Sequence, residues 1–299
     1  MTVWIVLLIF GVWFIGKMTA KSMDMKLKEE EERKKKETLQ RELERKRLDQ
    51  ERQQREARAA LDRKMWEIEE RQKRREQILM ANGERFDRDL AALPRVEIQL
   101  QPSPAMQPIS PVWSLFTYRN VTKASRLETL GDFITVDVET TGLHPELNEI
   151  VQLSAVTFRN FEAVDCFTSF VKPEKGINAK AASVNHITEE TVADAPLLGE
   201  IRSAFRSYVG EELPIVGHNL EFDLKFLVLS GCLKPDVSRR YYDTLALSRR
   251  TWNEGPYKLE SLGEDVLGIR RSDAHTALSD AYITGLLFQK ICHIRTNKQ

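Results

Sequence analysis

The sequence predicts an α/β domain in the C-terminal part of the chain, preceded by a transmembrane helix and a long charged helix. The first 16 residues carry no charged side chain, whereas residues 17–80 carry 21 Lys and Arg and 16 Asp and Glu. Five prolines then fall within 93–112. The remainder, 113–299, alternates short β-rich runs with helical patterns, which is typical of a mixed sheet flanked by helices.

Charge and cysteine content exclude several classes of protein. The chain has 299 residues, enough for one or two domains, and its 45 basic side chains balance its 45 acidic ones. Residues 81–299 hold 24 basic and 29 acidic side chains, so this is not a basic protein that coats nucleic acid. The three cysteines lie far apart, which excludes a disulfide scaffold or a zinc ribbon and favours a reducing compartment.

Residues 1–20 are predicted to form a transmembrane anchor. The uncharged run is followed by Lys17 and Lys21, and it just reaches the ~20 residues that a spanning helix needs when Lys17 lies at the interface. A cleaved signal peptide is the alternative, but no basic residue precedes the run. Because the positive charge follows the run, we expect a single-pass protein of the cell membrane with its catalytic domain on the cytoplasmic side.

Residues 21–92 are predicted to be one long charged helix. They contain no proline, a single glycine, and many residues with high helix propensity. Apolar residues such as Leu61, Met65 and Ile68 form only a short stripe. Two interpretations stay open: a solvated single helix, and a weak coiled coil that makes the protein a homodimer.

The prolines of 93–112 predict an extended linker, and 113–299 is predicted to be the globular domain. Its predicted strands are 133–138, 149–158, 163–171, 214–216 and 241–242. Its predicted helices are 196–209, 220–230, 244–252, 259–267 and 274–291.

The first predicted strand ends with two acids, Asp137 and Glu139, in the run Asp-Val-Glu-Thr-Thr-Gly. Side chains alternate along a strand, so these carboxylates point the same way, about 7 Å apart at their backbones. An apolar strand holds two such charges when a cation lies between them. Hard oxygen ligands suit Mg²⁺ or Mn²⁺.

Two further segments carry candidate site residues. The run from His218 to Asp223 follows a strand and begins a helix, which places Asp223 in the first turn. The second segment, from His275 to Asp280, also begins a helix. Carboxylates gathered at strand ends and helix starts can hold two metal ions that stabilise both oxygens of a phosphodiester under attack. A neighbouring histidine can accept a proton from the attacking water.

These three motifs, in this order and spacing, resemble those of the DEDDh (DnaQ-like) family of 3′–5′ exonucleases. That family includes the proofreading epsilon subunit and the PolC-type domain of bacterial replicative polymerases. The resemblance covers about 131–290. It implies a ribonuclease H-like fold with a mixed five-stranded sheet, flanked by helices. It also implies hydrolysis of single-stranded or frayed 3′ ends to nucleoside 5′-monophosphates, with two Mg²⁺ or Mn²⁺ ions per site.

The resemblance also implies roles for individual residues. The metal ligands would be Asp137, Glu139, Asp223 and Asp280, with Asp223 acting through water. His275 would be the general base. The backbone of Thr140, Thr141 and Gly142 would contact the terminal nucleotide, Leu143 would wedge near its base, and Asn219 and Phe222 would line the floor. Asn185 stands where many members have a histidine, so a substrate contact there is in doubt.

The expected partner is nucleic acid with a 3′ end, and DNA is favoured over RNA. Association with DNA replication or repair machinery and with the membrane is also expected. Two alternatives remain: an exoribonuclease that trims RNA 3′ ends, and a membrane scaffold with an inactive nuclease domain. All five residues of the DEDDh set are present, and this argues against the scaffold.

Overall fold

The computed structural model describes residues 2–102, 116–234, 239–270 and 276–296. The chain divides into two compact units, Met1–Arg74 and Arg75–Gln299. Each unit is described by itself below.

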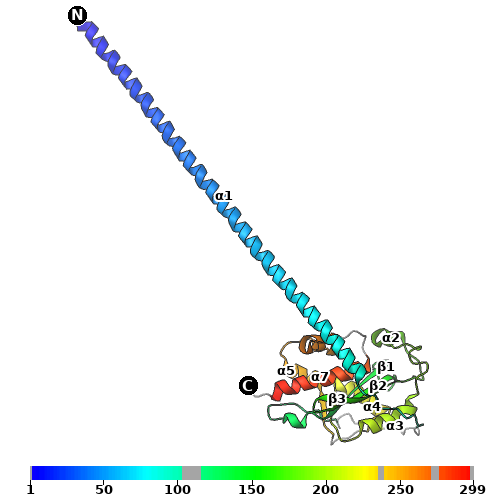
Figure 1. The fold of residues 1–299 in the computed structure, drawn as a ribbon. Coiled ribbons are helices and arrows are strands. Elements are labelled where there is room, and N and C mark those ends of the chain that lie inside the picture. The colour runs from blue at the N-terminus through cyan, green and yellow to red at the C-terminus, as the bar shows by residue number, and fades with distance from the viewer. Residues whose placement is uncertain (1, 103–115, 235–238, 271–275, 297–299) are drawn as a thin grey trace. The chain divides into compact units, whose positions relative to one another are not determined.

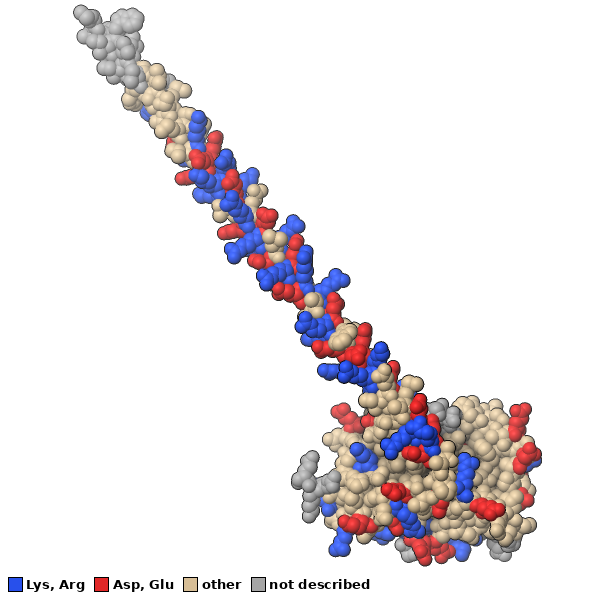
Figure 2. Space-filling model, viewed as in Figure 1, with Lys and Arg blue, Asp and Glu red and all other residues tan. Residues whose placement is uncertain are grey.

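The first unit is helical throughout its described length. Helix α1 runs without interruption over Thr2–Ala92, so the charged segment predicted to be helical is helical. Ion pairs link side chains four residues apart, as between Lys34 and Glu30 at 2.9 Å and between Arg52 and Glu56 at 2.9 Å. Figure 2 shows both signs of charge interspersed along this helix. The predicted coiled-coil pairing would need a second chain and stays a prediction.

Among the described residues, none of the helices combines the length and the apolar character needed to span a bilayer. The anchor predicted over 1–20 falls mainly on side chains outside the described set, namely those of 1–10, 12 and 14. The structure therefore gives no support to the predicted transmembrane helix.

The second unit is built on a mixed five-stranded sheet, as predicted, and its strand order is β3-β2-β1-β4-β5. Its strands are β1 (Phe133–Thr140), β2 (Ile150–Arg159), β3 (Glu162–Phe170), β4 (Ile215–Gly217) and β5 (Tyr241–Asp243). The first three form an antiparallel meander, and β4 and β5 run parallel to β1.

Helices cover both faces of this sheet (Figure 1). They are α2 (Ala179–Asn185), α3 (Leu198–Val209), α4 (Leu220–Leu229), α5 (Thr244–Thr251), α6 (Leu259–Leu262) and α7 (Ala277–Thr296), with short turns η2 (Leu127–Thr129) and η3 (Gly263–Leu267). Strand β1 shows how the alternation divides the core. Ile134 and Val136 pack with α3 and α4, whereas Phe133 packs with α7.

The end of α1 belongs to the second unit and packs into its core. Leu79 and Phe86 are each 3% exposed, and the ring centroids of Phe86 and Tyr282, which lies on α7, are 5.2 Å apart. The single glycine of this region, Gly83, approaches the Arg270 carbonyl so closely that any side chain there would collide with it. The compact unit thus begins at Arg75, earlier than the boundary at 113 predicted from the sequence.

The segments on either side of 103–115 lie along the two outer strands of the sheet. The Val96 amide donates to the Cys166 carbonyl on β3, and the Cys166 amide donates to the Pro94 carbonyl, both at 2.9 Å. On the other side, the Arg119 amide donates to the Tyr241 carbonyl on β5 at 2.7 Å. The start of the predicted linker is therefore bonded to the sheet, and backbone groups of both outer strands gain partners.

Candidate active site

Strand β1 presents Asp137 and Glu139 on the face of the sheet that α7 covers. Both are half-buried, and they face Ser154 and Gln152 across the antiparallel pair with β2. The register shifts between Glu139 and Thr140, where the strand ends. The predicted alternation is therefore confirmed: the two acids share one side of the strand, and Ile134, Val136 and Val138 face the other.

Helix α7 supplies the third acid, Asp280, in its first turn. The start of the helix is fixed by two side chains. The Thr276 hydroxyl oxygen accepts from the Ser279 amide at 3.2 Å, and the Gln152 side-chain oxygen accepts from the Ala277 amide at 3.0 Å. Gln152 is buried on β2, so the strand that faces Glu139 also sets where α7 begins.

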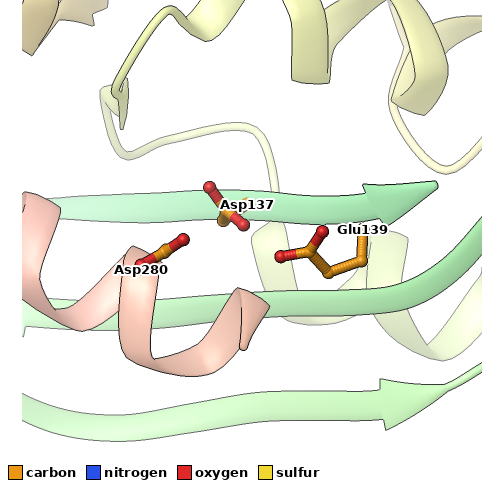
Figure 3. A group of neighbouring side chains, drawn as sticks. All are labelled: Asp137, Glu139 and Asp280. Carbon is orange, nitrogen blue, oxygen red and sulfur yellow. The ribbon is translucent and has the colours of Figure 1, made fainter. Parts of the chain in front are cut away.

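These two elements bring three carboxylates together (Figure 3). Asp137, Glu139 and Asp280 each offer an oxygen, and these oxygens lie within 4.8 Å of one another. Three like charges at that separation, partly removed from water, repel one another unless a cation is present. A half-buried set of carboxylate oxygens is the ligand chemistry that Mg²⁺ or Mn²⁺ prefers, so the residues present fit a divalent metal site.

Asp223 lies beside this group rather than within it. It is buried on α4, and its carboxylate accepts from the Val138 amide at 3.0 Å. Burial raises the pKa of the Asp223 carboxyl well above its ordinary value, and the charges of Glu139 and Asp243 raise it further. The bond from Val138 acts in the opposite direction. Asp223 is thus attached to β1 at the residue between the two strand acids.

Three of the predicted substrate residues line one pocket of about 500 Å³: Leu143, Asn219 and Phe222. Leu143 is 74% exposed, which leaves its side chain available to a ligand. The backbone amide of Asn219 donates to the Asp243 carboxylate at 3.0 Å, and this bond holds the turn between β4 and α4.

The other three predicted substrate residues form the turn after β1. Thr140 and Thr141 are buried, and the Thr140 hydroxyl donates to the Gly142 carbonyl at 2.7 Å. Asn185 is buried too, and its side-chain amide donates to the Thr140 carbonyl at 3.2 Å. Asn185 therefore supports the turn that carries the predicted substrate contacts.

The two motif histidines differ in what the structure describes. His218 is held between the Thr244 hydroxyl and the Tyr257 carbonyl, each at 2.9 Å. The carbonyl can only accept, so Nε2 carries a proton, and burial lowers the pKa of His218. His218 thus has a structural position. The proposed base His275 lies outside the described residues.

One contributor to the site was not anticipated from the sequence. Gln152 lies in the middle of a β-rich run, and no spacing or composition marks it as the partner of a helix that begins 125 residues later. The packing of α7 against β2 brings Gln152 to the start of that helix.

Comparison with known proteins places this arrangement in a family. The exonuclease family of RNase T matches residues 134–288, which is more than half of the chain. The chain belongs to this family, and residues 134–288 form an exonuclease domain of the DEDDh type. Divalent metal dependence accompanies this group, and the acidic cluster that it requires is present.

Curated relatives and solved structures share parts of the chain. PolC-type DNA polymerase III of Thermotoga maritima is 34% identical over 164 residues, which is 54% of this chain and 12% of the polymerase. The Staphylococcus aureus counterpart is 32% identical over 163 residues, 53% of this chain and 11% of that protein. The chain thus spans about an eighth of these relatives.

Exonuclease X in complex with 5′ overhanging duplex DNA aligns with a TM-score of 0.45 and 27% identity, over 56% of this chain and 94% of that one. Escherichia coli exonuclease I in complex with a dA16 oligonucleotide aligns with a TM-score of 0.47 and 22% identity, over 55% of this chain and 41% of that one.

Proposed function

We propose that the protein is a 3′–5′ exonuclease that releases nucleoside 5′-monophosphates from single-stranded or frayed 3′ ends, with DNA as the favoured substrate. One observation carries the proposal. Asp137 and Glu139 on β1 meet Asp280 on α7, from a segment about 140 residues away, with carboxylate oxygens within 4.8 Å of one another. Such a group stabilises the charge that develops when a phosphodiester is attacked, provided that divalent cations are bound.

In this proposal, Asp137, Glu139 and Asp280 hold the divalent ions, and Asp137 is shared between the two. Asp223 supports the second position through water. Bound Mg²⁺ or Mn²⁺ supplies positive charge to the attacking and leaving oxygens. The carboxylates fix where that charge lies, because β1 and the capped start of α7 are held by backbone hydrogen bonds.

His275 is proposed to accept the proton of the attacking water. It directly precedes Thr276, whose hydroxyl caps α7, so the chain leads from the proposed base into the helix that carries Asp280. A neutral imidazole takes a proton near neutral pH.

The pocket lined by Leu143, Asn219 and Phe222 is proposed to take the terminal nucleotide. The backbone of Thr140, Thr141 and Gly142 would contact its 3′ end, and the exposed Leu143 would wedge near its base. The turn is well suited to this, since the buried Thr140 and Thr141 leave their backbone fixed rather than adaptable.

The decisive experiment uses the full chain with 5′-labelled single-stranded DNA and RNA of the same sequence, with Mg²⁺, with Mn²⁺ and with EDTA. We expect a descending ladder of 5′-labelled products on DNA, faster than on RNA and absent in EDTA. Faster digestion of RNA would favour the exoribonuclease alternative. Release of a labelled 5′-mononucleotide as the first product would refute the polarity, and inactivity on both polymers would favour the scaffold.

We further propose that residues 1–20 anchor the protein in the cell membrane, with the nuclease on the cytoplasmic side. The support is the uncharged run followed by Lys17 and Lys21. Deleting 1–20 should move the protein from the membrane fraction to the supernatant while nuclease activity is kept. A truncated protein that still sediments with membranes would contradict the anchor.

Two partners are proposed on narrower grounds. A second copy of the chain would pair through 21–92, and light scattering of the detergent-solubilised protein would detect this pairing as a doubled mass.

The name of the curated relatives, DNA polymerase III, supports an association of this protein with DNA replication or repair machinery.

A further inference from the structure

Two rows of side chains lead from the catalytic acids across the sheet to its outer strand. Cross-strand partners place Glu139, Gln152 and Phe170 in one row and Asp137, Ser154 and Thr168 in the other. Directly paired residues point to the same face, so both rows lie on the face that α7 covers. Neighbouring strands are about 4.8 Å apart, and β3 therefore lies roughly 10 Å from the acids of β1.

The rows end in a pocket of about 470 Å³. Its walls come from Thr168, Ser169 and Phe170 on β3, from Asp87 and Leu90 on α1, and from Arg95. Phe170 is 37% exposed, so part of its side chain is open to a ligand. Gln152 and Thr276, the two side chains that cap α7, also line the pocket, so it adjoins the site of the three acids.

The chemistry of the lining matches one ligand class. An exposed phenyl ring offers a stacking surface to a nucleobase, and stacking of this kind tolerates any base. The Thr168 hydroxyl, which shares a hydrogen bond of 2.9 Å with the Ser154 hydroxyl, can also donate to or accept from a polar base edge. The Arg95 guanidinium suits a phosphate, and Asp87 can accept from a base amino group. A volume of several hundred Å³ is the size range of small-molecule sites.

We propose that this pocket binds an unpaired nucleotide of the same nucleic acid strand whose 3′ end reaches the three acids. The inference rests on the proposed function and adds a second nucleotide position to it. Two of its walls, the end of α1 and Arg95, precede the residues that match the exonuclease family.

The test compares two substrates on the full-length protein. A p-nitrophenyl ester of thymidine 5′-monophosphate has one nucleotide, so its rate of hydrolysis depends on the site of the three acids and not on the proposed pocket. An oligothymidylate is long enough to occupy both. For Phe170→Ala, we expect the ratio of kcat/KM on the oligonucleotide to that on the ester to fall about 5- to 100-fold, mainly through KM. Val164→Ala, a truncation of an exposed apolar residue elsewhere on β3, should leave the ratio as it is.

A second variant tests the phosphate contact and does not depend on the β3 core. For Arg95→Gln, the slope of log affinity for single-stranded oligonucleotide against log salt should become shallower by about 0.7, the value for one lost contact. An unchanged ratio in Phe170→Ala together with an unchanged slope in Arg95→Gln would overturn the pocket assignment. If the wild-type protein hydrolyses neither substrate, the proposed function itself has failed, and the two failures are thereby distinguished.

Discussion

Asp137 is the acid on which the proposed metal chemistry depends most, because in the proposal it would be a ligand of both ions. Replacing it with alanine should lower the rate by several orders of magnitude. The stability of the metal-free protein should hold or rise, since one of three mutually repelling charges is removed. Rates and melting temperatures of Asp137→Ala and of an exposed control, Asp194→Ala, test this. Near wild-type digestion by Asp137→Ala would refute the metal assignment.

His275 is tested by the pH dependence of the rate. A general base must be neutral to accept a proton, so the single-turnover rate should rise with pH across the range in which a histidine loses its proton and then level off. His275→Gln should lose on the order of 10²–10⁴-fold in rate together with this pH dependence. Affinity for Mn²⁺ should change little, because His275 is not a proposed ligand. A variant that keeps most of the rate and the wild-type profile would assign His275 to structure.

Asp223 should make stability depend on pH in a defined direction. Folding raises the pKa of Asp223, so ionisation of this carboxyl favours the unfolded state. This loss in the free energy of unfolding is absent below about pH 3.9, the ordinary pKa, and grows as the pH rises to the pKa of the folded state. In EDTA, Asp223→Asn should therefore be more stable than the wild type near pH 7, and the difference should shrink on acidification. The asparagine keeps an acceptor for the Val138 amide. A melting-temperature difference that does not vary with pH would rule this explanation out.

At the scale of the elements, what the sequence could predict follows from local periodicity. The two-residue alternation of β1 was enough to place Asp137 and Glu139 together, and the five strands were found because each is a β-rich run. The motif from His218 to Asp223 and the motif from His275 to Asp280 identify the other two acids, and the structure places each in the first turn of a helix.

The contributions that the sequence did not indicate all depend on contacts between distant segments. The role of Gln152 requires that β2 and α7 meet, and the burial of Leu79 requires that the end of α1 packs against the rest of the second unit. A charged helix with few apolar residues resembles a solvated one over most of its length, so its last turns gave no local sign of packing. Proline likewise indicated a spacer at 93–112, yet Pro94 offers its carbonyl to β3.

The start of α7 can be tested through Gln152. Gln152→Leu keeps an apolar body but leaves the Ala277 amide without its buried acceptor, which should cost about 1–3 kcal/mol of folding free energy. Because Asp280 lies in that turn, the Mn²⁺ concentration for half-maximal rate should also rise. Gln53→Leu on the exposed face of α1 is the matched control. If Gln152→Leu needs the same Mn²⁺ concentration as the wild type, the hydrogen bond at the start of α7 does not position Asp280 for metal binding.

At the scale of the whole molecule, the boundary between the two units decides which fragment is a complete nuclease. A fragment starting at Arg75 keeps every contact of the second unit. It also keeps the bond from the Asn82 side chain to the Gly268 carbonyl at 2.8 Å and the ion pair between Arg75 and Asp265 at 2.7 Å. We expect this fragment to unfold at the same temperature as the nuclease in the full chain and to show the same rate on a short oligonucleotide.

A fragment starting at 93 should behave differently, because it lacks Leu79 and Phe86, each 3% exposed in the second unit. Losing a buried leucine or phenylalanine side chain typically costs about 2–5 kcal/mol, so the deletion should remove on the order of 4 kcal/mol or more. That is a large share of the roughly 5–15 kcal/mol that stabilises most domains. Urea unfolding of the two fragments measures the difference. Equal midpoints would mean that the end of α1 lies against the rest of the second unit without stabilising it, and the stable domain would then begin after α1.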